Sequence, residues 1–92
     1  MERDQAIELL ESNHEFPGPF QFRVVVRPAD RTSTVSAMSA SVGDATVLDI
    51  EERASRNGTY IALHVRMQLE RAEQVLDVYE VLGQLPGVLA KM

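Results

Sequence analysis

The side chains best suited to chemistry in this chain are cationic, and most of them stand at alternate positions of strand-like stretches. The candidate binding residues are Arg23, Arg27, Arg53, His64 and Arg66. A guanidinium is a planar fork of N–H donors, which matches the paired oxygens of carboxylates and phosphates. Because alternate residues of a strand share a face, these side chains should gather on one surface of a sheet. The pattern predicts a docking surface for a small anionic ligand or an acidic protein partner.

The same charges fit a second interpretation, a solvated face made of cross-strand ion pairs. Asp49 should lie opposite Arg66, and Glu51 opposite His64, on two paired strands. Exposed pairs of this kind contribute about 0–1 kcal/mol each and need no ligand. Both interpretations stay open on the sequence alone. Val25 lies in the middle of this face, which suggests that a second copy of the chain covers part of it in a homodimer.

No residue pattern indicates catalysis. The chain has no cysteine, and neither a serine–histidine–carboxylate order nor a glycine-rich nucleotide loop stands out. Its two histidines, His14 and His64, lie far apart, without further ligands at metal-binding spacing. We therefore expect a protein that is not an enzyme, with no catalytic residue, no metal and no cofactor.

Composition limits the partners and the compartment. Nine Lys and Arg against 14 Asp and Glu give a net charge of −5, which argues against binding to nucleic acid or to an anionic membrane. An RNA-binding sheet would also need stacking aromatics on its outer face, whereas Phe20 and Phe22 should face the core. No apolar stretch approaches the roughly 20 residues of a membrane span. The first residues are acidic and do not read as a signal peptide, so we expect a cytoplasmic location.

A hairpin from Thr46 to Leu69 should position this surface. Apolar and polar residues alternate from Ile61 onward, which is the pattern of a strand with one buried face. Asn57-Gly58 is typical of a two-residue type I′ turn, and Tyr60 should pack over the hairpin beside it. Such a turn fixes the register, and the predicted inward pairs are Leu48 with Met67, Ile50 with Val65, and Ala54 with Ile61.

The other segments complete an α+β domain. The remaining predicted elements are a strand over 20–27, a helix over about 30–41, a helix over 70–82 and a short strand over 88–92. Asp30 is the expected N-cap of the first helix, and Gly83 the expected left-handed C-cap of the second. The order is that of a ferredoxin-like βαββαβ sandwich, with a four-stranded antiparallel sheet in the order 4-1-3-2 and both helices on one face. Residues 1–15 should form a helical or mobile N-terminal extension, with a short helix, to this single domain of residues 16–92.

Three runs of residues resemble a known family. They are Phe16-Pro17-Gly18-Pro19-Phe20 leading to Arg23-Val24-Val25, Ser55-Arg56-Asn57-Gly58-Thr59-Tyr60, and Glu73-Gln74-Val75 followed by Tyr79, Leu82 and a final Val88. Their order and spacing resemble the YbeD-like family of small uncharacterised bacterial proteins over about residues 14–92. The chain departs from that pattern at Val26-Arg27-Pro28, where the family often has glycine, and at Ala62, where it often has serine. The resemblance implies a fold similar to ACT regulatory domains and no established reaction.

Two hypotheses for the function follow. The first is a regulatory or binding domain, ACT-like and without enzymatic activity, that senses a small ligand through the open sheet face. The second is a protein-interaction adaptor that uses acidic residues of helix 70–82. That helix should bury Ala72, Val75, Leu76, Tyr79 and Leu82, and expose Glu73, Asp77 and Glu80.

Overall fold

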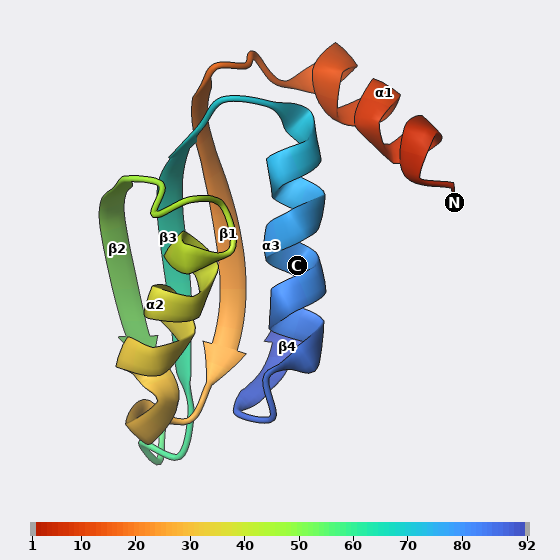
Figure 1. The fold of residues 1–92 in the computed structure, drawn as a ribbon. Helices are drawn as coiled ribbons and strands as arrows, with labels where there is room; N and C mark the ends of the chain where they lie inside the picture. The colour runs from red at the N-terminus through yellow and green to blue at the C-terminus, as the bar shows by residue number, and fades with distance from the viewer. Residues whose placement is uncertain (1, 92) are drawn as a thin grey trace.

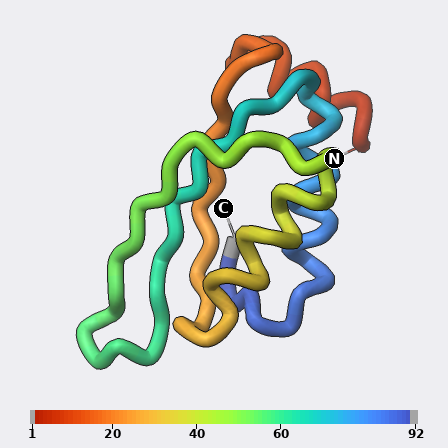
Figure 2. The backbone as a smooth tube through the Cα atoms, turned by 60° about the vertical axis from the view of Figure 1, so that its left-hand side comes forward, coloured from red at the N-terminus to blue at the C-terminus, as the bar shows by residue number. Residues whose placement is uncertain are grey.

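The computed structural model describes residues 2–91 and shows a four-stranded antiparallel sheet with helices on one face (Figure 1). The elements are α1 (Arg3–Asn13), β1 (Gly18–Val26), the 3-10 turn η1 (Pro28–Asp30), α2 (Arg31–Ala40), β2 (Val47–Ala54), β3 (Ile61–Leu69), α3 (Ala72–Gln84) and β4 (Val88–Lys91). The strands lie in the order β2-β3-β1-β4, which is the predicted order read from the other edge. Helices α2 and α3 lie on the same side of the sheet (Figure 2), and α1 contacts α3. The α+β class is confirmed, and the arrangement is broadly consistent with the predicted sandwich.

The core lies between the sheet and the two helices. The central strands β1 and β3 alternate as their sequences predict, and their inward side chains are buried. The buried hydrophobic residues of these strands are Phe22, Val24, Val26, Ile61, Leu63, Val65, Met67 and Leu69. Helix α3 buries Val78 rather than Leu76 or Tyr79, which are half-buried, so its buried stripe is rotated from the predicted one. Burial raises the pKa of the Tyr79 phenol, whose ring lies 5.4 Å from that of Phe22.

Two predicted helix caps differ from the structure. Helix α3 continues through Gly83 to Gln84, and the described glycines with positive φ are Gly43 and Gly58. Gly83 is therefore a helical residue and not a left-handed C-cap. Asp30 stands at the N-cap position of α2, but its side chain makes no capping hydrogen bond.

The hairpin keeps most of its predicted register. Ile50 lies opposite Val65 and Ala54 opposite Ile61, as expected. The predicted pairing of Leu48 with Met67 is wrong, because a bulge between Val47 and Asp49 places Val47 opposite Met67 instead. Leu48 is consequently 46% exposed. Since Val47 and Leu48 are both apolar, either could satisfy the inward position, and the alternating pattern alone could not reveal the extra residue.

The turn of the hairpin is longer than predicted. The Ser55 amide donates to the Tyr60 carbonyl over 2.8 Å, and the Gly58 amide donates to the Ser55 carbonyl over 3.0 Å. Gly58 has a φ of +70°, whereas Asn57 is not among the residues with positive φ, and a type I′ turn requires both. The Ser55 hydroxyl also accepts from the Tyr60 amide over 3.1 Å. The hydroxyl and the glycine together close a loop of residues 56–59 instead of a two-residue turn.

The edge strand β2 is joined to α2 by an ion pair. Glu52 lies opposite the buried Leu63 and thus on the helix-facing side of the sheet. Its carboxylate accepts a hydrogen bond of 2.5 Å from the Arg31 guanidinium at the start of α2. This pair turns Glu52 away from the opposite face of the sheet, where the candidate binding residues lie.

Candidate functional site

The strand register places the outward side chains of β1, β3 and β2 in parallel rows. The first row is Gln21, Arg66 and Asp49, the second is Arg23, His64 and Glu51, and the third is Val25, Ala62 and Arg53. Four of the five predicted binding residues therefore share one face. In the described chain, the helices that pack on the sheet lie on its other side (Figure 2).

Arg27 is the predicted site residue that the structure does not bring into these rows. Strand β1 ends at Val26, one residue before the predicted end, and Arg27 flanks the 3-10 turn. Pro28 begins that turn and cannot donate to a strand ladder, which explains the early end. Arg27 is exposed and lies beyond the end of β1, so its side chain does not belong to these rows.

Gln21 is a site residue that the sequence analysis did not select. Its amide Nε2 lies 3.1 Å from Nδ1 of His64. When the amide donates, Nδ1 accepts, and the proton of the neutral ring is then on Nε2, free to be donated elsewhere. The contact is diagonal to the register, since Gln21 lies opposite Arg66 and His64 lies opposite Arg23. Predicting the residue pairing between β1 and β3 from the sequence would have placed Gln21 close to His64.

The cross-strand ion pairs expected from the sequence are not formed. Asp49 lies opposite Arg66 and Glu51 opposite His64, yet neither pair approaches to ion-pair distance. Between residues 2 and 91 the ion pairs are Arg3 with Asp77, Arg31 with Glu52, and Arg71 with Glu73. The cationic groups of the outer face thus keep their hydrogen-bonding capacity.

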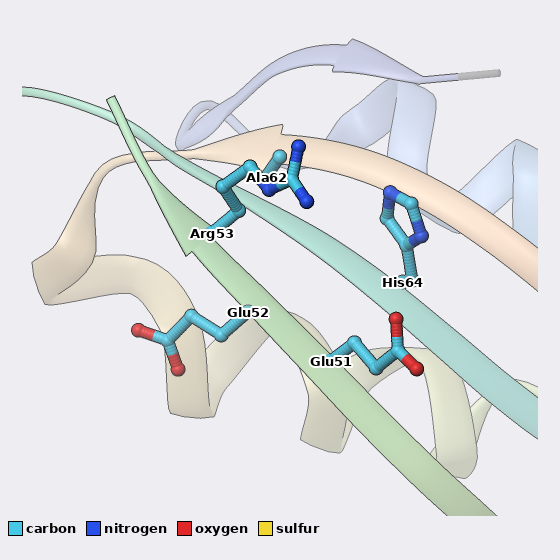
Figure 3. A pocket seen from close by; sticks show the side chains of 5 residues that line it. All are labelled: Glu51, Glu52, Arg53, Ala62 and His64. Carbon is cyan, nitrogen blue, oxygen red and sulfur yellow. The ribbon is translucent and has the colours of Figure 1, made fainter. Parts of the chain in front are cut away.

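Three adjoining hollows form a trough along the outer face of β3, which we call the outer trough. The central hollow, of about 190 Å³, is lined by Glu51, Glu52, Arg53, Ala62 and His64 (Figure 3). A polar hollow of about 110 Å³ is lined by Gln21, Asp49, Glu51, His64 and Arg66. A third hollow, of about 290 Å³, is lined by Val25, Arg53, Ala54, Ser55, Tyr60, Ile61 and Ala62. The central hollow shares two residues with each of the others, so the three are continuous.

The arginine and histidine side chains of the outer trough come from two neighbouring strands. Figure 3 shows Arg53 of β2 and His64 of β3 projecting over the sheet, with Glu51 extended toward His64 and Glu52 pointing away. Arg66 lines the polar hollow beyond His64. Arg23 is adjacent to His64 in register but borders none of the three hollows. The arrangement can donate several hydrogen bonds to an anion, with Glu51 available as an acceptor.

Neither a cluster of metal-binding side chains nor a membrane-spanning helix is found among the described residues. From residue 2 to residue 91 no group of three or more histidine, cysteine or acidic side chains could hold a metal ion. None of the helices in that part of the chain is long and apolar enough to cross a membrane. By its lining residues, the outer trough combines hydrogen-bond donors and acceptors with an adjoining apolar hollow.

The fold and the site together define a small α+β domain whose helix-free sheet face carries a trough lined by arginine and histidine. A family model described as "Protein of unknown function (DUF493)" matches residues 11–92, and the chain belongs to that family. This confirms the resemblance to the YbeD-like family drawn from the sequence. A search of curated proteins finds no match.

Two solved structures share the fold. The C-terminal domain of the MgtC protein from Mycobacterium tuberculosis matches with a TM-score of 0.68 and 21% identity, covering 87% of this chain and 88% of that domain. Protein HP0495 from H. pylori matches with a TM-score of 0.70 and 15% identity, covering 90% of this chain and 92% of that one. At these identities the likeness concerns the fold alone.

Proposed function

We propose that this protein is a non-enzymatic regulatory domain that binds a small anion in the outer trough. One observation carries the proposal: Arg53, His64 and Arg66 line one continuous trough, and none of them is neutralised by an ion pair. Arginine forks of this kind suit carboxylate and phosphate oxygens. The alternative is a solvated surface that binds no anion.

The chemistry of the trough supports binding rather than turnover. His64 is held by Gln21, and no acidic side chain lies at hydrogen-bond distance behind it to form a catalytic relay. Ser55 is the aliphatic hydroxyl that lines the trough, and it accepts a hydrogen bond from the Tyr60 amide in the hairpin turn. A nucleophile paired with an oriented base is thus lacking among the residues that line the trough.

The test is an amide chemical-shift titration of labelled protein with sodium acetate and with sodium phosphate at constant ionic strength. We expect saturable shifts at Arg53, His64 and Arg66 with at least one of the two anions. Charge reversal of Arg66 to glutamate should abolish them, because Arg66 lines the polar hollow. The matched control is Arg56→Glu, because Arg56 lies in the hairpin loop outside the outer trough. Loss of binding in the control as well would show a general charge effect and contradict the proposal.

The alternative, an adaptor acting through the acidic face of α3, has less support. Asp77 is paired with Arg3 of α1 at 3.1 Å, and Glu73 with Arg71 at 3.4 Å. Two of the three acidic groups are therefore already engaged. An adaptor would be silent toward both anions, would show line broadening along residues 72–84 in cell extract, and would keep that response after the charge reversal.

A further inference from the structure

Building on the proposed function, we infer that the ligand is an amphipathic monoanion, such as an aliphatic monocarboxylate. Its carboxylate contacts Arg53 and His64 in the central hollow of the outer trough. Its tail lies in the third hollow, over Val25, Tyr60 and Ala62. The inference rests on the way in which charged and apolar linings meet in this trough.

The two hollows meet at one residue pair, Arg53 and Ala62, which line both. On the central side of this pair stands His64, and on the other side stand apolar groups, with Tyr60 44% exposed. An arginine has an aliphatic stem behind its charged head, so Arg53 can contact a carboxylate and cover the start of an apolar tail. A ligand that spans the junction would use both properties.

The size of the hollows limits the ligand. Pockets for small molecules commonly have volumes of about 300–1,000 Å³. The central and third hollows, of about 190 and 290 Å³, together lie in the lower half of that range. A single acid group with a short tail fits this space better than a nucleotide or another large metabolite.

The charges of the trough favour one negative charge over two. Glu51 lines the central hollow and the polar hollow, and Asp49 lines the polar hollow as well. These carboxylates face the same space as the cations and would repel a second negative charge on the ligand. A dianion such as inorganic phosphate should therefore bind more weakly than a monocarboxylate.

The experiment is a chemical-shift titration of the full chain with acetate, butyrate and hexanoate at constant ionic strength, with inorganic phosphate as the comparison. Full burial of a methylene is worth about four-fold in affinity, and we expect about two-fold on this open surface. Hexanoate has four more methylenes than acetate and should thus bind roughly 16-fold more tightly. The additional shifts should appear at Val25, Tyr60 and Ala62.

Three variants distinguish the contribution of the ligand's apolar tail to affinity from that of its carboxylate. Tyr60→Ser should remove most of the dependence of affinity on chain length, and Val25→Ser serves as a second tail variant if the first is unstable. Glu51→Gln should raise the affinity for acetate several-fold, because it removes the opposing carboxylate.

Four outcomes can be told apart. Tighter binding of longer acids in wild type, lost in a tail variant, supports the inference. Binding of acetate or phosphate with no gain from chain length overturns it and leaves the proposed function standing. If affinity still increases with chain length in both tail variants, the inference is also wrong, because the tail then lies outside the third hollow. If none of the four anions produces saturable chemical-shift changes, both the inference and the proposed function are wrong.

Discussion

At the scale of single residues, Gly87 occupies a position where a side chain has no room. A Cβ atom at this position would lie 2.5 Å from Cγ and Oδ2 of Asp30, and 2.8 Å from its Cβ. Inserting a methyl group into such a contact costs about 1–3 kcal/mol. We therefore expect Gly87→Ala to lower the free energy of unfolding by about that amount, as measured by urea denaturation.

The contact can be checked by a double-mutant cycle with Asp30→Gly, which removes all three of the close atoms. The combined variant should be more stable than the sum of the two single effects predicts, because the clash is relieved. Strict additivity would show that Asp30 is not the obstacle.

The contact between Asp30 and Gly87 could not be predicted from the sequence. Asp30 before a helix is typical of an N-cap, and its position was predicted correctly, but its side chain lies against Gly87, far along the chain. Local patterns describe a residue's own element and say nothing of a contact between distant loops. Tertiary packing took precedence over the local capping preference.

At the scale of elements, the helix α1 is held by few contacts. None of its residues is buried, and its ion pair joins Arg3 to Asp77 over 3.1 Å between side chains that are 51% and 41% exposed. Leu10 is partly buried against the core. Exposed ion pairs contribute little, so the apolar contact should be the stronger attachment.

Two substitutions compare these attachments. Arg3→Gln should lower the free energy of unfolding by less than about 0.5 kcal/mol. Leu10→Ala should lower it by about 1–2 kcal/mol, less than the 2–5 kcal/mol of a fully buried leucine. Both values come from urea denaturation of the full chain. If Arg3→Gln lowers the free energy of unfolding by as much as Leu10→Ala or by more, the ion pair and not Leu10 is the main contact that holds α1 on the domain.

Element types were predictable where one periodicity dominated. The alternation in β1 and β3 identified both central strands and their inward faces. Element ends were less predictable, since Gly83 is compatible with a helix interior as well as with a cap. The bulge at Leu48 and the longer hairpin loop are further departures of this kind, because each depends on backbone geometry that a residue pattern does not specify.

At the scale of the whole molecule, the outer trough exists only because three strands from distant parts of the chain lie side by side. The alternating patterns predicted the shared face of Arg23, Arg53, His64 and Arg66, because each strand's inward side was clear. The absence of ion pairs across that face could not be predicted, since register brings residues opposite one another without fixing their side-chain conformations. Those conformations leave the arginines of this face without an ion-pair partner among the described residues.

Binding in the trough should also be visible in the stability of the whole domain. A ligand that binds the folded state alone, at ten times its Kd, stabilises that state by about 1.4 kcal/mol. For a domain of this size that corresponds to a rise in Tm of roughly 5–10 °C. We expect hexanoate to produce this rise at concentrations where acetate produces little, in calorimetry against sodium chloride of equal ionic strength.

Arg53→Gln tests whether the stabilisation arises in the trough, because Arg53 lines both the central hollow and the third hollow. This variant should show little rise in Tm with hexanoate, whereas Arg56→Gln, which removes an equal charge from the hairpin loop, should respond as wild type does. The comparison separates binding at one site from a general effect of carboxylate salts on the solvent, which would raise the Tm of both variants alike. A uniform rise would therefore remove the calorimetric support for a site in the trough, and the chemical-shift titration would then have to locate the ligand elsewhere or exclude it.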